Sequence, residues 1–356
     1  MGLIYLIRHS EAEGNLYRIA QGHEDGTLTR RGWEQVRALS RRFEDVPVDV
    51  VYSSDLHRAC ATASAIYKPK GLPLHRDIAL REAFLGDWEG RPWGEISRQE
   101  PQQLSNFSMA PGQWQVKNAE TALQAQQRLE KALLSIAKRH MDETAAVVSH
   151  GYAIRMLLGK LQGYTMDNMG TSPQEGNTAV SLLEYDGNAL RLIFRGDDSH
   201  VSLYGSPAAA VRHPGKVEGG MYYRQPQSAE DDGRVRAMVR AAAEEAGQEP
   251  SEPVDFSLFG LRSDDGPDAL LQMGRGGNMV TLYVSPEQRC QGLGVQLIGQ
   301  AQQWAQSQGL EALYVTVHEN SPAIAFLEDC GFIQVADSSE GLIRLEKRLS
   351  PGESEL

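Results

Sequence analysis

Four short apolar runs, each followed by polar or charged residues, constrain the fold of the first half of the chain. They are Leu3–Ile7, Asp49–Tyr52 (DVVY), Ala145–Val148 (AAVV) and Val180–Leu183 (VSLL). Runs of this length are typical of strands buried on both faces of a sheet. Amphipathic helical patterns lie between them, one from a cap at Thr29 to Phe43 and a longer one over Ala119–His140. This alternation predicts an α/β/α sandwich with a mostly parallel sheet.

The chain has 356 residues, which is long for a single core and favours two domains. The strand and helix alternation ends after Leu203. Residues 205–219 (GSPAAAVRHPGKVEG) are rich in Gly, Pro and Ala and predict a linker. We therefore expect one domain over 1–204, a smaller α+β domain over 220–350 and a tail over 351–356. The second domain has predicted strands at 221–224, 256–261, 270–272, 280–284, 312–317 and 342–346, and predicted helices at 230–246, 294–308 and 322–329.

The composition excludes several classes of protein. A net charge of −12 argues against a nucleic-acid partner, although an acidic protein can still bind an anionic substrate at a locally basic site. The cysteines Cys60, Cys290 and Cys330 are far apart and form neither a disulfide framework nor a zinc motif. No run approaches the length needed to span a bilayer, so we expect no membrane association and a cytoplasmic location.

Charged residues follow three of the predicted strands directly. Arg8-His9 follows the first strand, a segment ending in His57-Arg58 follows the second, and Ser149-His150 follows the third. The carboxyl ends of parallel strands meet at one edge of a sheet, which is where α/β proteins bind their ligands. Guanidinium groups bind phosphate oxygens, and a neutral imidazole is a capable nucleophile. The arrangement therefore favours phosphoryl transfer over a set of merely structural histidines.

The fragments LIRHSEAEGN, VYSSDLHRACATA, LREAFLGDWEG and VVSHGYAIR resemble the histidine phosphatase family, also called phosphoglycerate-mutase-like. The resemblance covers about residues 1–204 and implies phosphomonoester hydrolysis through a phosphohistidine, with no metal or cofactor. By this resemblance His9 is the nucleophile and Glu82 is the proton donor. Arg8, Arg58 and His150 complete the catalytic set, and Ser10, Asn15 and Gly22 are expected to line the substrate pocket.

Some positions depart from the family pattern. Ser10, Ala12 and Gly14 stand where the family commonly has Gly, Thr and Trp, which leaves the substrate open. Phosphoglycerate mutases carry a longer basic insertion after the glutamate motif. Here that region holds Trp88, Trp93 and Trp114 and few basic residues, which favours a phosphatase over a mutase. The tryptophans predict a helical cap packed on the sheet, with an apolar lid as the alternative.

A second candidate site is the turn Arg289–Gly294 (RCQGLG), between a predicted strand and a predicted helix. Amide groups at a helix N-terminus, approached across glycines, can bind a diphosphate. A dinucleotide loop is disfavoured because the third glycine position falls on Leu297. The turn and the segment Val317–Ala323 (VHENSPA) resemble GNAT acyltransferases, and the resemblance covers about residues 220–348.

This second resemblance implies acetyl-CoA as cofactor and an amine as acyl acceptor. The cofactor-binding residues that it implies are Leu282, Val284, Arg289, Cys290, Gln291, Gly292, Leu293, Gly294 and Asn320. Many family members have a Tyr acid where this chain has Leu327. His318 and Cys330 are candidate substitutes, with Cys330 better explained as a core residue.

Three functional hypotheses remain open at this stage. In the first, the chain is a bifunctional phosphatase and N-acetyltransferase. In the second, the C-terminal domain only senses acyl-CoA or docks a partner, because Leu327 cannot donate a proton. In the third, the first domain is a phosphoglycerate mutase. The expected partners are a small phosphomonoester and an unidentified amine; the sequence indicates no oligomeric state.

Overall fold

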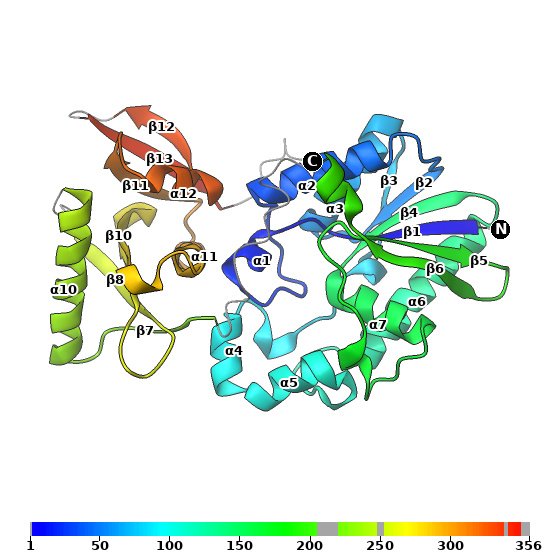
Figure 1. Ribbon diagram of the computed structural model, residues 1–356, viewed down its shortest axis with the longest axis horizontal. Coiled ribbons are helices and arrows are strands. Elements are labelled where there is room, and N and C mark those ends of the chain that lie inside the picture. The colour runs from blue at the N-terminus through cyan, green and yellow to red at the C-terminus, as the bar shows by residue number, and fades with distance from the viewer. Residues whose placement is uncertain (1, 205–219, 248–252, 338–340, 350–356) are drawn as a thin grey trace.

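The computed structural model describes residues 2–204, 220–247, 253–337 and 341–349. The expected linker 205–219 and tail 351–356 lie outside the described residues. Figure 1 shows an N-terminal α/β domain, coloured blue to green, beside a smaller C-terminal domain, coloured yellow to red. No helix in the described ranges combines the length and apolarity needed to cross a membrane.

The first domain is built on one six-stranded sheet of order β3-β2-β4-β1-β5-β6. Its strands are β1 (Gly2–Arg8), β2 (Val50–Ser53), β3 (Leu74–Arg76), β4 (Thr144–Ser149), β5 (Val180–Tyr185) and β6 (Leu190–Asp197). Strands β3, β2, β4 and β1 pair in parallel, whereas β5 pairs antiparallel with both of its neighbours, β1 and β6. The predicted mostly parallel sheet is confirmed. The sequence patterns did not predict β3 and β6.

Helices cover both faces of this sheet. They are α1 (Glu13–Tyr17), α2 (Arg30–Arg42), α3 (His57–Lys70), α4 (Trp93–Gln99), α5 (Pro101–Met109), α6 (Ala122–Arg139), α7 (Gly151–Leu161) and α8 (Ser199–Tyr204). Because side chains alternate along a strand, Ile4 and Leu6 of β1 pack with α6 and α7, while Ile7 packs with α2 and α3. Two helices begin at side-chain caps: Thr29 accepts a hydrogen bond from Gly32 N, and Thr121 forms a capping box with Gln124.

The second domain contains two antiparallel sheets. The first has the order β10-β9-β8-β7 and the second β11-β13-β12. The strands are β7 (Tyr222–Arg224), β8 (Val254–Leu261), β9 (Ala269–Gly274), β10 (Met279–Val284), β11 (Ala312–His318), β12 (Ile333–Asp337) and β13 (Leu342–Arg348), and the helices are α10 (Ala229–Ala246), α11 (Leu293–Ser307) and α12 (Ala323–Asp329). A single bridge, between Asn278 and Tyr314, joins the two sheets. The strands β10 and β11 therefore diverge beyond this point.

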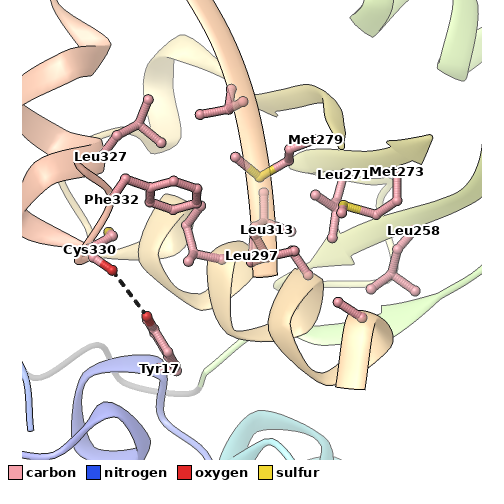
Figure 2. Packing of buried hydrophobic residues seen from close by; sticks show 14 of the residues in the cluster. Tyr17, Leu258, Leu271, Met273, Met279, Leu297, Leu313, Leu327, Cys330 and Phe332 are labelled. Carbon is pink, nitrogen blue, oxygen red and sulfur yellow. Dashed lines mark hydrogen bonds between the residues drawn. The ribbon is translucent and has the colours of Figure 1, made fainter. Parts of the chain in front are cut away.

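The two domains share part of one hydrophobic core. Tyr17 and Ile19 of the first domain belong to the apolar cluster of the second. Figure 2 shows the Tyr17 side chain pointing toward the end of α12, where its hydroxyl donates to the carbonyl of Cys330 at 3.5 Å. A Cβ on Gly299 of α11 would lie 2.6 Å from the Cβ of Tyr17. This glycine lets α11 pack directly on α1.

Candidate active sites

The charged residues that follow β1, β2 and β4 converge at one edge of the sheet, as the sequence predicted. β4 lies between β1 and β2, and Arg8 of β1 is level with Ser149 of β4. The backbone N–H of His9 donates to Ser149 O at 2.9 Å. The ring centroids of His9 and His150 are 5.1 Å apart. The sheet thus places both histidines at a single site.

The imidazole of His9 is oriented by its own loop. Its Nδ1 lies 2.7 Å from the carbonyl oxygen of Ser10, an acceptor, so Nδ1 carries the proton and donates. The lone pair then resides on Nε2. Burial holds the pKa of His9 well below its usual range, and the charges of Arg58 and Arg8 add to this effect. His9 is therefore a neutral imidazole near pH 7, which is the nucleophilic form.

Positive and donor groups surround this nucleophile. The Arg58 side chain is 1% exposed, and its two Nη atoms donate to the carbonyls of Glu24 and Gly22. Arg8 donates through Nη1 to Glu175 O, while its buried Nε has no partner among the described residues. His150 is fully buried, and both ring nitrogens likewise lack partners within the described ranges. Unpartnered buried donors of this kind fit an anion such as phosphate.

The carboxyl group of Glu82 lies at the N-terminal end of α7, whose N-cap residue is His150. Its Oε2 accepts the N–H of Tyr152 at 2.9 Å, and its Oε1 accepts the N–H groups of Ala153 at 2.8 Å and Ala83 at 3.0 Å. Two of these bonds satisfy N–H groups in the first turn of α7, which have no carbonyl partner within the helix. The carboxyl group of Glu82 is thereby fixed beside the histidine pair.

The three expected substrate-pocket residues have different surroundings. The Ser10 hydroxyl is buried and lies 3.0 Å from Thr62 Oγ1 on α3. Asn15 uses its Oδ1 to accept from Ala12 N. Gly22 leaves no room for a side chain, since a Cβ would lie 2.4 Å from Ala83 O. Gly22 adjoins the site through its bond to Arg58, whereas Ser10 and Asn15 mainly fix the loop after His9; their substrate contacts stay predictions.

Sequence reasoning missed several residues that organise the site. Glu89 accepts the backbone N–H groups of Gly22, His23 and Glu24 and so shapes the loop beneath Arg58. The ring of His23 bonds to Glu82 O at 2.9 Å. Asn177 donates to His9 O at 3.1 Å. Each of these side chains bonds to a backbone group that is distant in sequence. Glu89 belongs to the DWEG fragment that carries the family resemblance, but the resemblance gave it no role.

The tryptophans form the packed cap that the sequence favoured over a lid. Trp88 and Trp114 are 0% and 2% exposed. They pack with Phe107 of α5, which stacks on Tyr152 of α7 with 4.2 Å between ring centroids. This aromatic cluster fixes α5 over the N-terminal end of α7, close to Glu82.

The second domain contains a cavity of about 190 Å³ where β10 and β11 diverge. Its walls come from β10, β11, α10 and α12: Ala242, Ala243, Ala246, Met279, Val280, Thr281, Leu282, Val315, Thr316, Val317, His318, Ser321, Ala323, Phe326 and Leu327. A register shift in the β9–β10 pairing occurs at Val280, between Met279 and Thr281. Such a bulge leaves one residue unpaired in the ladder and turns its backbone toward new partners. The cavity lining combines apolar side chains with polar ones such as Thr316, His318 and Ser321.

The predicted anion loop follows β10 and opens α11. Cys290 and Gly292 have left-handed backbones, with φ of 58° and 75°, and Gly292 caps the helix. A Cβ on Gly294 would lie 3.2 Å from the ring of Phe326. Arg289 bends back, donating through Nε to Val284 O and pairing with Glu245. The exposed loop and helix N-terminus suit a diphosphate, so these residues fit the expected cofactor.

Other predicted cofactor residues occupy the same edge. Leu282 lines the cavity, and Val284 ends the same strand. Leu293 is buried, whereas Gln291 bonds Arg262 through its side chain. Asn320 is exposed beyond β11, and its N–H donates to His318 Nδ1. The cavity lining thus includes Leu282, whereas the loop Arg289–Gly294 follows the same strand outside the lining.

The candidate acids around this cavity differ in position. Leu327 lines the cavity and is 2% exposed. His318 lines it as well, at the end of β11. Cys330 belongs to the core cluster, and burial raises the pKa of its thiol to about 12. Cys330 is thus a core residue, and His318 is the better placed of the two candidate substitutes.

Comparison with known proteins matches a different family to each domain. The profile of the histidine phosphatase superfamily (branch 1) matches residues 4–198, more than half of the chain. The profile of the acetyltransferase (GNAT) family matches residues 216–332.

Individual relatives match the first domain. The adenosylcobalamin/alpha-ribazole phosphatase of Escherichia coli is 30% identical over 47% of this chain and 82% of its own. The phosphoglycerate mutase-like protein 4 of Arabidopsis thaliana is 31% identical over 57% of this chain and 88% of its own. The solved structure of Bacillus stearothermophilus YhfR superposes with a TM-score of 0.54 at 33% identity, covering 56% of this chain and 99% of that one. The chain belongs to the histidine phosphatase superfamily, branch 1, and carries a second domain of the GNAT acetyltransferase family.

Proposed function

We propose that the first domain hydrolyses a small phosphomonoester through a phosphohistidine at His9, and that the second transfers an acetyl group from acetyl-CoA to an amine. The observation that carries the first part is the neutral, oriented imidazole of His9 beside the unpartnered donors of His150 and Arg8. The similarity to the alpha-ribazole phosphatase supports a small-molecule substrate.

In the first step, His9 Nε2 attacks phosphorus. A P–N bond forms, the P–O bond to the leaving group breaks, and Glu82 delivers a proton to the leaving oxygen. Arg8, Arg58 and His150 donate to the non-bridging oxygens, where charge is spread in the transition state. Because burial keeps water away from these donors, their interaction with the phosphoryl group is strong.

In the second step, water attacks the phosphohistidine. The carboxylate of Glu82, left by the first proton transfer, accepts a proton from this water as the new P–O bond forms. The P–N bond breaks, and inorganic phosphate and neutral His9 are released. The hydrogen bonds from the Tyr152 and Ala153 amides hold Glu82 in one place for both transfers.

Hydrolysis is favoured over mutase chemistry by the cap. A mutase retains a bisphosphate, which needs additional cationic ligands. Two of the three basic side chains of the cap are engaged elsewhere: Arg91 pairs with Glu95 and Glu100, and Arg98 pairs with Asp264 of the second domain, while Lys117 is exposed. Free cationic ligands for a second phosphate are thus scarce in this region.

A direct assay separates the two chemistries. Purified protein is incubated with a panel of metabolite phosphomonoesters and with p-nitrophenyl phosphate, and phosphate release is measured. A parallel reaction follows the exchange of 2- and 3-phosphoglycerate in the presence of the bisphosphate. We expect phosphate release without exchange; exchange faster than phosphate release would instead establish a mutase.

In the second domain, the amides of Cys290–Gly294 would hold the CoA diphosphate, and the backbone of Leu282–Val284 would pair with the pantetheine arm. Bound there, the cofactor supplies an acyl thioester. Its acyl end would lie in the cavity near the bulge at Val280 and near His318. Leu327 cannot protonate a leaving thiolate, so His318 or water takes that role in this proposal.

Calorimetry with acetyl-CoA and a thiol-release assay over a panel of amines test this part. Binding together with amine-dependent CoA release supports acetyl transfer. Absence of binding refutes the cofactor assignment, whatever the phosphatase rate.

A second candidate is an acyl-CoA sensor coupled to the phosphatase. Leu327 favours it, and so does the packing of α11, whose N-terminus is the anion loop, on α1 beside His9. Acetyl-CoA binding that changes the phosphatase rate, without thiol release from any amine, would select this function.

A further inference from the structure

A small pocket lies between the two domains, next to the phosphatase site. Its walls are the segment 13–25 of the first domain and one face of α11. The lining includes the three acidic residues Glu13, Glu24 and Asp25, together with Gln302. Its volume of about 20 Å³ holds one group the size of a water molecule or an ammonium. The pocket therefore combines side chains from both domains.

The same segment contacts the phosphate-binding arginine. The carbonyl oxygen of Glu24 accepts from Arg58 Nη1 at 2.9 Å. The Asp25 carboxylate accepts the N–H of His57 at the start of α3, one residue before Arg58. The loop that contributes Glu24 and Asp25 to the pocket therefore also contacts Arg58 and the residue before it.

Two acceptor atoms in the pocket have no partner. Glu24 Oε2 is buried and unbonded among the described residues, and so is Gln302 Oε1. Gln302 as a whole is 8% exposed, and its Nε2 donates to Glu13 at 3.0 Å, which fixes its Oε1 as the free acceptor. A buried acceptor without a donor lowers the stability of the folded protein. A ligand that donates a hydrogen bond to each of these two atoms would remove that cost.

The other carboxylates of the pocket are already engaged. Glu13 forms an ion pair with Lys347 and also accepts from Gln302. Asp25 accepts from the N–H groups of His57 and Gly26. Glu24 alone among these three has no hydrogen-bond partner for its carboxyl group in the described part of the chain. Burial and the nearby Glu89 raise the pKa of Glu24, and a cation in the pocket would favour its ionised form.

We propose that this pocket binds the ammonium group of the phosphatase substrate, which would be a phosphorylated amine. The proposal rests on the phosphatase function proposed above. An ammonium has donors for both free acceptors and the charge to pair with Glu24. A carboxylate would be repelled by Glu13, Glu24 and Asp25 and would offer neither acceptor a proton. In this arrangement Gln302, a residue of the acetyltransferase domain, helps to set phosphatase specificity.

Matched substrates test the proposal. O-Phosphoethanolamine and 2-hydroxyethyl phosphate differ only in an ammonium in place of a hydroxyl. We expect kcat/KM to be about tenfold or more higher for the amine, the size of one charge-assisted hydrogen bond. Equal values for the two substrates, or a preference for the hydroxyl compound, would overturn the proposal.

Variants locate the effect within the pocket. In Glu24→Gln and in Gln302→Met, the ratio of the two kcat/KM values should fall toward one, and the change should lie mainly in KM. This ratio cancels any general loss of activity caused by a substitution. Glu44→Gln and Gln308→Met make the same two substitutions at exposed positions and serve as matched controls. Both control variants should keep the wild-type ratio. A wild-type ratio in both pocket variants would contradict the assignment.

A binding measurement separates this proposal from the phosphatase function itself. Calorimetry of the His9→Ala protein needs no turnover. Tighter binding of O-phosphoethanolamine than of 2-hydroxyethyl phosphate supports the pocket even if wild-type turnover fails. Turnover of p-nitrophenyl phosphate with no preference for the amine in either measurement would remove the pocket proposal and leave the phosphatase intact.

Discussion

Glu13 and Lys347, which are 334 positions apart, form a buried ion pair across the domain interface. Glu13 begins α1, four residues after His9, and Lys347 lies on β13 of the second domain. Each residue is 5% exposed. The loop that follows His9 is therefore anchored by the second domain.

Removing one member of this pair should destabilise the interface strongly. In Lys347→Met the Glu13 carboxylate keeps only Gln302 and stays buried, which we expect to cost about 3 kcal/mol or more. Urea unfolding followed by circular dichroism measures this loss. The neighbouring Arg348→Met is the control, because Arg348 is 77% exposed and its pair with Glu346 contributes little. Equal stabilities of the two variants would show that the pair does not hold the domains.

Glu82→Gln should slow substrates according to their leaving group. An alkoxide leaves poorly without a proton, whereas p-nitrophenolate leaves with little help. We expect kcat/KM to fall by about 10²-fold or more for an alkyl phosphate and much less for p-nitrophenyl phosphate. Equal losses for both substrates would argue that Glu82 only supports the fold at the start of α7.

The sequence predicted where the candidate phosphatase residues lie, because each follows a strand or belongs to a fragment that carries the family resemblance. Arg8, His9, Arg58 and His150 needed only the parallel sheet to bring them together. The organising role of Glu89 was not predictable, since its ligands are backbone groups of a loop far away in sequence.

The domain interface was also beyond sequence reasoning. No sequence pattern singled out Tyr17, and only the fold shows that it packs in the core of the other domain. Strands β3 and β12 were missed for a related reason: β3 has three residues, and β12 exposes Ile333 and Val335, so neither gives a buried run.

His200 should make the protein sensitive to acid. Burial, together with Arg42, lowers its pKa to about 4 in the folded state, whereas an unfolded histidine titrates near 6.5. Between these values the unfolded chain binds more protons, so stability falls as the pH drops from 6.5 toward 4, by up to about 3 kcal/mol. The effect fades as the pH rises to about one unit above 6.5, where the unfolded histidine is also neutral.

Unfolding free energies at pH 6.5 and 4.5 test this prediction in the wild type and in His200→Gln. The variant should lose less stability than the wild type over this interval. His75→Gln, at an exposed histidine, serves as the control and should behave as the wild type does. An unchanged pH dependence in His200→Gln would assign the acid sensitivity to other groups, such as His9 and His150.

The proposed mechanism requires a covalent phosphoryl group at His9. Protein is quenched in alkali during turnover of p-nitrophenyl phosphate and then digested with trypsin. This digest should yield a phosphorylated peptide beginning at His9, because trypsin cleaves after Arg8. The label should be lost in acid and should be absent from His9→Ala, whose turnover should fall by at least about 10³-fold. Full turnover with this peptide unmodified, or wild-type turnover in His9→Ala, would contradict the mechanism.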